Sequence, residues 1–186
     1  MRFSHLTVLA LSTLSLASPI VSKRADAISL LEDLYATIQI YTGAINTTLA
    51  PLTIDSPILN KTAATAQVGT QINLITAAIT STTTEIDALP HASPSTTATS
   101  ETVEKRQLGL TVGVLLSLII VEIFATLTGA LALLGLGGLL VFLNPLTSAL
   151  SLLIVTVQLV LDVVLLDVIA LLNALLTSLA LGVSGL

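Results

Sequence analysis

Few residues of this chain could do chemistry, and the sequence does not place them to act together. The two histidines are His5, in an apolar N-terminal segment, and His91, in a stretch rich in Ser, Thr and Pro. One imidazole without a partner forms neither a Ser–His pair nor a histidine metal site. Asp162 and Asp167 are five positions apart in the sequence, so on a helix they point about 140° apart and do not converge. The sequence therefore predicts a protein that is not an enzyme and uses no cofactor or metal.

The acidic residues lie in a strongly apolar C-terminal region, residues 107–186. Its charged residues are Glu122, Asp162 and Asp167, and it contains no Lys or Arg. Two helical stretches, 108–134 and 146–182, are expected to form a hairpin. Between them, the glycines at 135, 137 and 138 should loosen the helix, and Asn144-Pro145 should start the second stretch. A soluble domain cannot hide this much apolar surface in its own core. The region is therefore expected to meet a bilayer, a lipid, a hydrophobic surface or copies of itself.

A thin polar seam runs along these apolar helices. At 100° per residue, many polar residues of the last stretch share an arc of about 120°. They are Thr147, Ser148, Ser151, Gln158, Asp162, Asn173, Thr177 and Ser184. Glu122 lies in a similar arc of the preceding stretch, and Gly109, Gly113 and Ser117 form a row of small residues that allows close helix approach. Two interpretations stay open: Glu122 and Asp162 pair across the hairpin, or the seam (Glu122, Gln158, Asp162, Asn173) specifies how the helices face each other.

The N-terminal end has the features of an exported protein. Residues 1–17 read as a signal peptide, with Arg2, an apolar segment and a cleavage site after Ala17. A pro-segment, 18–24, would end at the dibasic pair Lys23-Arg24. Two N-x-[ST] triplets, at Asn46 and Asn60, are candidate N-glycosylation sites.

Residues 25–89 are predicted to form two antiparallel amphipathic helices. The first apolar stripe consists of Ile28, Leu31, Leu34, Ile38, Tyr41, Ile45 and Leu49, and the second of Val68, Ile72, Ile75, Ile79, Ile86 and Leu89. Asp26 is expected to cap the first helix and Pro51 to end it, while Ser56-Pro57 should start the second. A Ser/Thr/Pro linker, 90–106, ends in a second dibasic pair, Lys105-Arg106, and a cut there would release a chain starting at Gln107. The fold is expected to be all-α: an amphipathic bundle region followed by long, very apolar helices.

The segment from Asp26 to Asn46 (DAISLLEDLYATIQIYTGAIN), after a signal peptide and a dibasic pair, resembles the opening of a fungal family. This is the family of hydrophobic-surface-binding proteins and cell-wall galactomannoproteins, and the resemblance covers residues 25–90. It implies a secreted, cysteine-free helical bundle that adsorbs to hydrophobic surfaces or holds fatty acids. The residues after Arg106 depart from the family pattern, which is more polar in its later helices.

The charge balance narrows the range of partners. The net charge of −5 and the lack of a basic cluster exclude nucleic acid and attraction to anionic lipid head groups. The expected function is binding of hydrophobic surfaces or lipids outside the cell or at the cell wall. Two alternatives remain: an integral membrane protein anchored by a C-terminal transmembrane hairpin, and a dibasic-processed precursor whose released tail self-assembles.

Overall fold

The computed structural model describes the backbone of residues 19–89, 101–161 and 165–184, and the side chains of residues 26–89, 107–161 and 165–180. Within these ranges the chain forms five helices and no strand, which confirms the all-α prediction. The helices are α1 (Pro19–Leu49), α2 (Ile58–Asp87), α3 (Glu101–Leu134), α4 (Leu136–Leu161) and α5 (Leu166–Ser184). Below, the N-terminal pair means α1 and α2, and the tail means α3, α4 and α5.

The helices of the N-terminal pair pack through the two predicted apolar stripes. Most of the stripe residues are buried, and Thr82 and Thr83 are buried with them on the core-facing side of α2. The predicted capping residues are wrong in both helices. Asp26 lies inside α1, because the helix already begins at Pro19. Ser56 does not cap α2: Pro57 is the N-cap residue and no side-chain cap bond forms, and the Ser56 hydroxyl accepts the backbone N–H of Thr53 at 2.8 Å instead.

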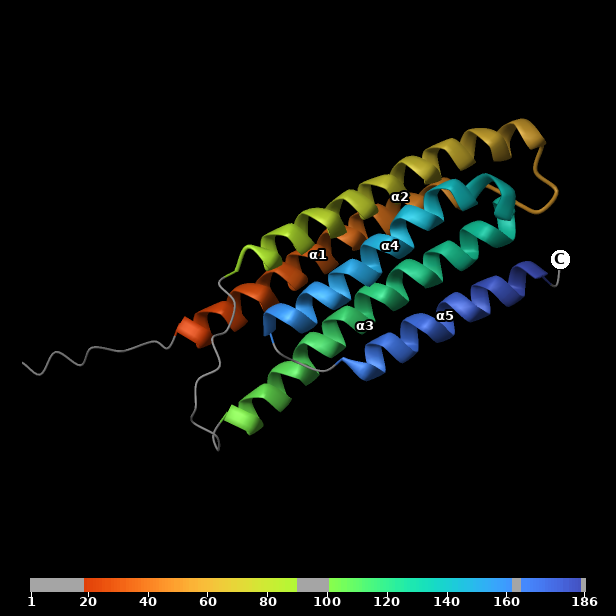
Figure 1. Cartoon of the computed structure of the whole chain (residues 1–186). Helices are drawn as coiled ribbons and strands as arrows, with labels where there is room; N and C mark the ends of the chain where they lie inside the picture. The colour runs from red at the N-terminus through yellow and green to blue at the C-terminus, as the bar shows by residue number, and fades with distance from the viewer. Residues whose placement is uncertain (1–18, 90–100, 162–164, 185–186) are drawn as a thin grey trace, which may run out of the picture.

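The tail packs lengthwise on the N-terminal pair (Figure 1). α3 lies along α1, α4 lies along α2, and α5 lies against the side of α3. α1 and α3 run in the same direction, as do α2 and α4 (Figure 1). Each long helix of the tail therefore has one helix of the N-terminal pair as a parallel neighbour, and the side chains between them form one hydrophobic core.

The tail helices differ from their predicted limits. α3 begins at Glu101, so residues 101–106, expected to end the linker, are helical. α4 begins at Leu136, directly after Gly135, so the expected helix start at Asn144-Pro145 is wrong and Pro145 lies inside α4. Leu139 and Leu143, which precede this proline, are buried in the core, and their burial offsets the roughly 3 kcal/mol that an internal proline costs.

The last predicted stretch, 146–182, is also not one helix. α4 ends at Leu161 and α5 begins at Leu166, while residues 162–164 lie outside the described part of the chain. α5 turns its apolar side, including Val168 and Leu172, toward α3. The predicted hairpin of apolar helices is therefore formed by α3 and α4, with α5 as an additional helix on α3.

Candidate apolar binding surface

One face of α3 points away from the bundle and is aliphatic. Leu110, Val114, Leu118 and Val121 recur at helical spacing and are exposed, with Leu110 70% accessible to solvent. These four side chains form the α3 outer row. Between Gln107 and Leu134 the sequence has a single charged residue, Glu122, and its side chain is half-buried. The α3 outer row is therefore an uncharged, water-facing strip of branched side chains.

α4 has a similar exposed face. Val141, Leu152, Val155 and Leu159 are exposed and lie on one side of the helix; they form the α4 outer row. Asn144, Pro145, Ser148 and Ser151 are exposed beside them, so this face is apolar with small polar interruptions. Residues 136–161 contain no charged side chain. Exposed aliphatic rows on two helices exceed the scattered single hydrophobic residues that are normal on a soluble protein.

The exposed side of α5 has a different character. Its exposed residues include Asp167, Asn173, Thr177 and Ser178, together with small alanines. α5 is therefore an amphipathic helix that buries Val168 and Leu172, keeps most of its other leucines half-buried, exposes Leu166 and presents a polar side to water. It covers one side of α3 and leaves the α3 outer row open.

Glu122 faces α1 rather than the outer surface of the tail. The Thr42 hydroxyl, in α1, donates a hydrogen bond of 2.7 Å to Glu122 Oε1. Thr42 is only 1% exposed. Among the described side chains, this is the hydrogen bond that joins the N-terminal pair to the tail. A charged acceptor strengthens such a bond, so the contact fixes how α3 is turned toward α1.

The other predicted seam residues do not join Glu122. Gln158 is half-buried in α4, Asn173 is exposed on α5, and Asp162 lies outside the described residues. Ser148, Ser151 and Thr177 are exposed as well. In the described part of the chain the seam is therefore divided between the α1–α3 interface and the outer surface. Thr42 was missed from the sequence, although its spacing from Ile38 and Ile45 places it on the buried side of the first helix.

Two close approaches fix α2 against α4. A Cβ atom added to Gly69 would lie 2.4 Å from Cε2 and Cζ of the Phe142 ring, which therefore fills the space of the missing side chain. A Cβ atom on Gly138 would lie 2.8 Å from the Cγ2 atom of Thr65. Gly113, from the predicted small-residue row, instead faces Leu165 and Val168, with contacts of 3.8 Å from an added Cβ. Gly69 and Gly138 therefore lie at the contact between α2 and α4, whereas Gly113 lies on the side of α3 that faces the start of α5.

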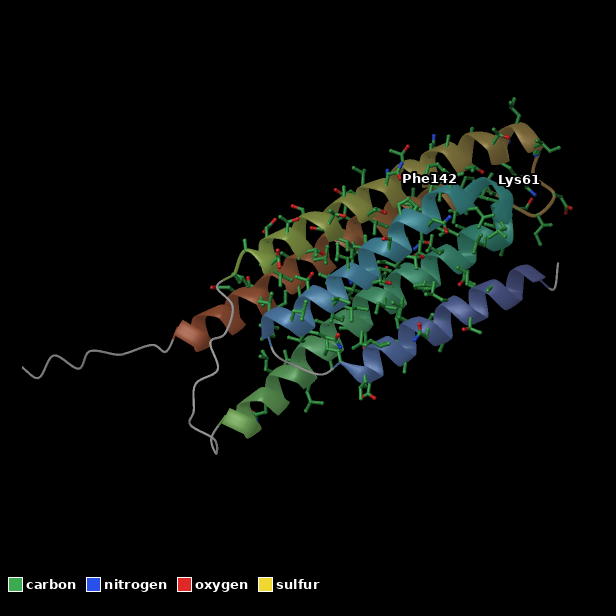
Figure 2. All side chains as sticks on the ribbon, in the orientation of Figure 1. Lys61 and Phe142 are labelled. Carbon is green, nitrogen blue, oxygen red and sulfur yellow. The ribbon has the colours of Figure 1, made fainter. Side chains whose placement is uncertain are left out.

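A hollow of about 570 Å³ lies beside these contacts, at the end of the bundle near the α3–α4 turn. Ile58, Leu134 and Phe142 line its apolar part, and Lys61 lies at the same end (Figure 2). The Lys61 ammonium group donates to the Ile54 carbonyl oxygen. The hollow contains no acidic side chain, and no group of three or more His, Asp or Glu that could hold a metal ion occurs among the described residues.

The candidate modification sites lie on helices or beyond the described side chains. Asn46 is exposed on α1 and Asn60 is exposed in the first turn of α2. Lys23 and Arg24 fall within the backbone of α1, and Lys105 and Arg106 within that of α3, where side chains are not described. Ala17 lies outside the described residues. Their processing and glycosylation therefore remain predictions.

Two helices of the tail have the length and composition of membrane spans. They are Gln107–Leu134, with 28 residues, and Leu136–Leu161, with 26 residues. About 20 apolar residues suffice to cross a bilayer. Comparison with family models gives no match, and neither the curated proteins nor the solved structures include a similar chain. The resemblance to the fungal surface-binding family therefore stays a prediction, and the function must be argued from the surface itself.

Proposed function

We propose that this protein is a non-enzymatic binder of hydrophobic surfaces or lipids, and that the outer rows of α3 and α4 are its adhering surface. The observation that carries the proposal is the aliphatic, uncharged character of both rows, each exposed along its helix. The N-terminal signal features, the two sequons and the family resemblance support a location outside the cell or at the cell wall.

The adhesion energy can be estimated from the α3 outer row. Leu110, Val114 and Leu118 are each about half to two-thirds exposed, and full burial of such a side chain contributes about 1.5–3 kcal/mol. Their transfer to an apolar surface therefore contributes about 3 kcal/mol together. Each 1.4 kcal/mol corresponds to a factor of ten, so these three residues account for about a hundredfold in affinity.

The test compares adsorption of two triple variants on alkyl-coated silica. The first replaces Leu110, Val114 and Leu118 with Gln and is expected to adsorb about a hundredfold more weakly than the wild type. The matched control replaces Ile40, Ile54 and Leu74 with Gln in the same way; these residues are similarly exposed but lie outside the tail. Its adsorption should stay within about twofold of the wild type. Equal losses in both variants would show that adsorption has no preferred face, and no loss in the first would refute the proposed surface.

A membrane anchor is the second candidate, favoured by the length of the two apolar helices. In the bundle, however, α1 lies along α3 and exposes Glu32, Asp33 and Asn46. If α3 spanned a bilayer in this arrangement, those polar groups would enter the acyl region, where each carboxylate costs about 3 kcal/mol. The packed bundle therefore favours surface binding. Fractionation of expressing cultures separates the candidates, because a surface binder is recovered in the culture supernatant, whereas an anchored chain is found only with the membranes.

A further inference from the structure

The faces of α3 and α4 that point toward the N-terminal pair are mostly apolar as well, with Glu122 of α3 as the charged exception. Val112, Leu116 and Ile119 of α3 and Leu146, Leu153 and Val157 of α4 are buried in the core. Helices that are apolar on all sides are typical of the interior of large proteins and of membrane spans. In this small bundle the N-terminal pair provides the apolar environment for one side of each helix. Acyl chains can provide the same environment for all of these side chains except Glu122, whose carboxylate costs about 3 kcal/mol there.

α3 and α4 also have the connection and the lengths of a membrane hairpin, while most of their contacts are to the N-terminal pair. Its helices are joined through Gly135 alone, whose φ of +80° permits the sharp turn. Each helix is longer than the about 20 residues that a span requires. The N-terminal pair cannot accompany them into a bilayer, because it carries exposed Glu32, Asp33 and Glu85. Insertion of the hairpin therefore requires the pair to separate from it.

We propose that the N-terminal pair is a removable cover, and that the covered faces of α3 and α4 are a second lipid-binding surface for the acyl chains of a bilayer. This inference rests on the proposed function, since the outer rows first bring the bundle to the lipid. The cover is held mainly by aliphatic contacts, which acyl chains can replace. Among the described side chains, the Thr42–Glu122 hydrogen bond is the polar contact that must break.

The contact between Thr65 and Gly138 offers a way to lock the cover. A Cβ atom on Gly138 would lie 3.8 Å from the Thr65 Cβ, close to the mean Cβ–Cβ distance of a disulfide. The chain contains no cysteine, so a Thr65→Cys/Gly138→Cys variant can form only this intramolecular bridge. Gly138 lies near the α3–α4 turn, the end of the hairpin that must cross the bilayer. The bridge therefore ties α2 to the inserting end.

The experiment uses the full chain and neutral phosphatidylcholine vesicles, with flotation to measure binding and carbonate washing to measure insertion. The same double variant is assayed oxidised and reduced, and Thr65→Cys alone controls for the redox conditions. We expect oxidation to lower the carbonate-resistant fraction of bound protein at least tenfold, while flotation changes less than twofold. The reduced variant should insert like the wild type.

Three other results of this experiment would overturn the proposed cover. Equal carbonate resistance in the oxidised and reduced forms would overturn the cover, because a locked bundle would then insert. Flotation without carbonate resistance in either form would also overturn it, while leaving the surface-binding function intact. Absence of flotation in both forms and in the wild type would overturn the cover and exclude this lipid as a target, while adsorption on alkyl-coated silica decides separately whether the outer rows bind hydrophobic surfaces.

Discussion

The contact between Gly69 and Phe142 tests whether α2 packs on α4 as described. In a helix interior, replacing Gly with Ala stabilises by about 1 kcal/mol. At Gly69, however, the new methyl group would lie 2.4 Å from two ring atoms of Phe142, and overpacking of this kind costs about 1–3 kcal/mol. We therefore expect Gly69→Ala to leave the free energy of unfolding unchanged or to lower it by up to about 2 kcal/mol.

The sign should reverse when the ring is removed. In a Phe142→Ala background the obstruction is absent, so Gly69→Ala should stabilise by about 1 kcal/mol. The coupling between the two sites is then about 1–3 kcal/mol. Gly43 in α1 is the matched control: it is helical, and nothing lies within 4 Å of its added Cβ. Gly43→Ala should stabilise by about 1 kcal/mol with or without Phe142.

Urea unfolding followed by far-UV circular dichroism measures all of these differences, provided that the denaturant slope is unchanged between variants. A Gly69–Phe142 coupling below about 0.3 kcal/mol would mean that the two residues are independent. That result would refute the packing of α2 on α4, and with it the idea that the N-terminal pair covers the tail.

Three further predictions concern the turn, the polar contact and the linker. Thr42→Val removes the hydroxyl that donates a hydrogen bond of 2.7 Å to Glu122. It should lower the free energy of unfolding, measured in urea, by about 1–2 kcal/mol. Thr42→Ser keeps a hydroxyl and should lower this free energy less, so equal losses in the two variants would contradict the hydrogen bond. Gly135→Ala places a side chain at φ +80° and should destabilise by about 1–2 kcal/mol, whereas Gly137→Ala, with no neighbour within 4 Å, should not. In a chain that starts at residue 25, after the first dibasic pair, cleavage after Arg106 by a dibasic-specific protease should yield two fragments that co-elute on size exclusion, because both contribute to one core; separate elution would favour a released tail.

The sequence was informative where periodicity alone decides the structure. The apolar stripes predicted α1 and α2 and their buried sides, because each helix needs one apolar side against the core. In the tail, periodicity is weak since nearly every side chain is apolar. Helix limits there depend on packing, which explains why Pro145 lies inside α4 when local rules favour it at a helix start.

The polar partner of Glu122 could not be predicted for a similar reason. The angular position of Glu122 on its helix follows from the sequence, but the helix that it faces is set by the tertiary arrangement. A hairpin in isolation suggests Asp162, whereas the bundle places Thr42 of α1 opposite Glu122. A threonine within an apolar stripe is a weak signal, because threonine hydroxyls bond back to their own helix, as Thr83 does to Ile79.

The exposed apolar rows follow from the distribution of charge along the chain. The described charged side chains of the N-terminal pair are exposed apart from the half-buried Lys61, while residues 107–161 have a single charged side chain, Glu122, which the α1–α3 contact uses. A helix that is apolar all round and has neighbours on only part of its circumference must expose aliphatic side chains, and α5 covers only one side of α3. Each outer-row residue contributes independently, so single substitutions there should change adsorption in steps of about 1 kcal/mol and stability hardly at all. Substitutions at the Gly69–Phe142 contact should change stability and leave adsorption of the closed bundle unaltered, because that contact is inside the molecule.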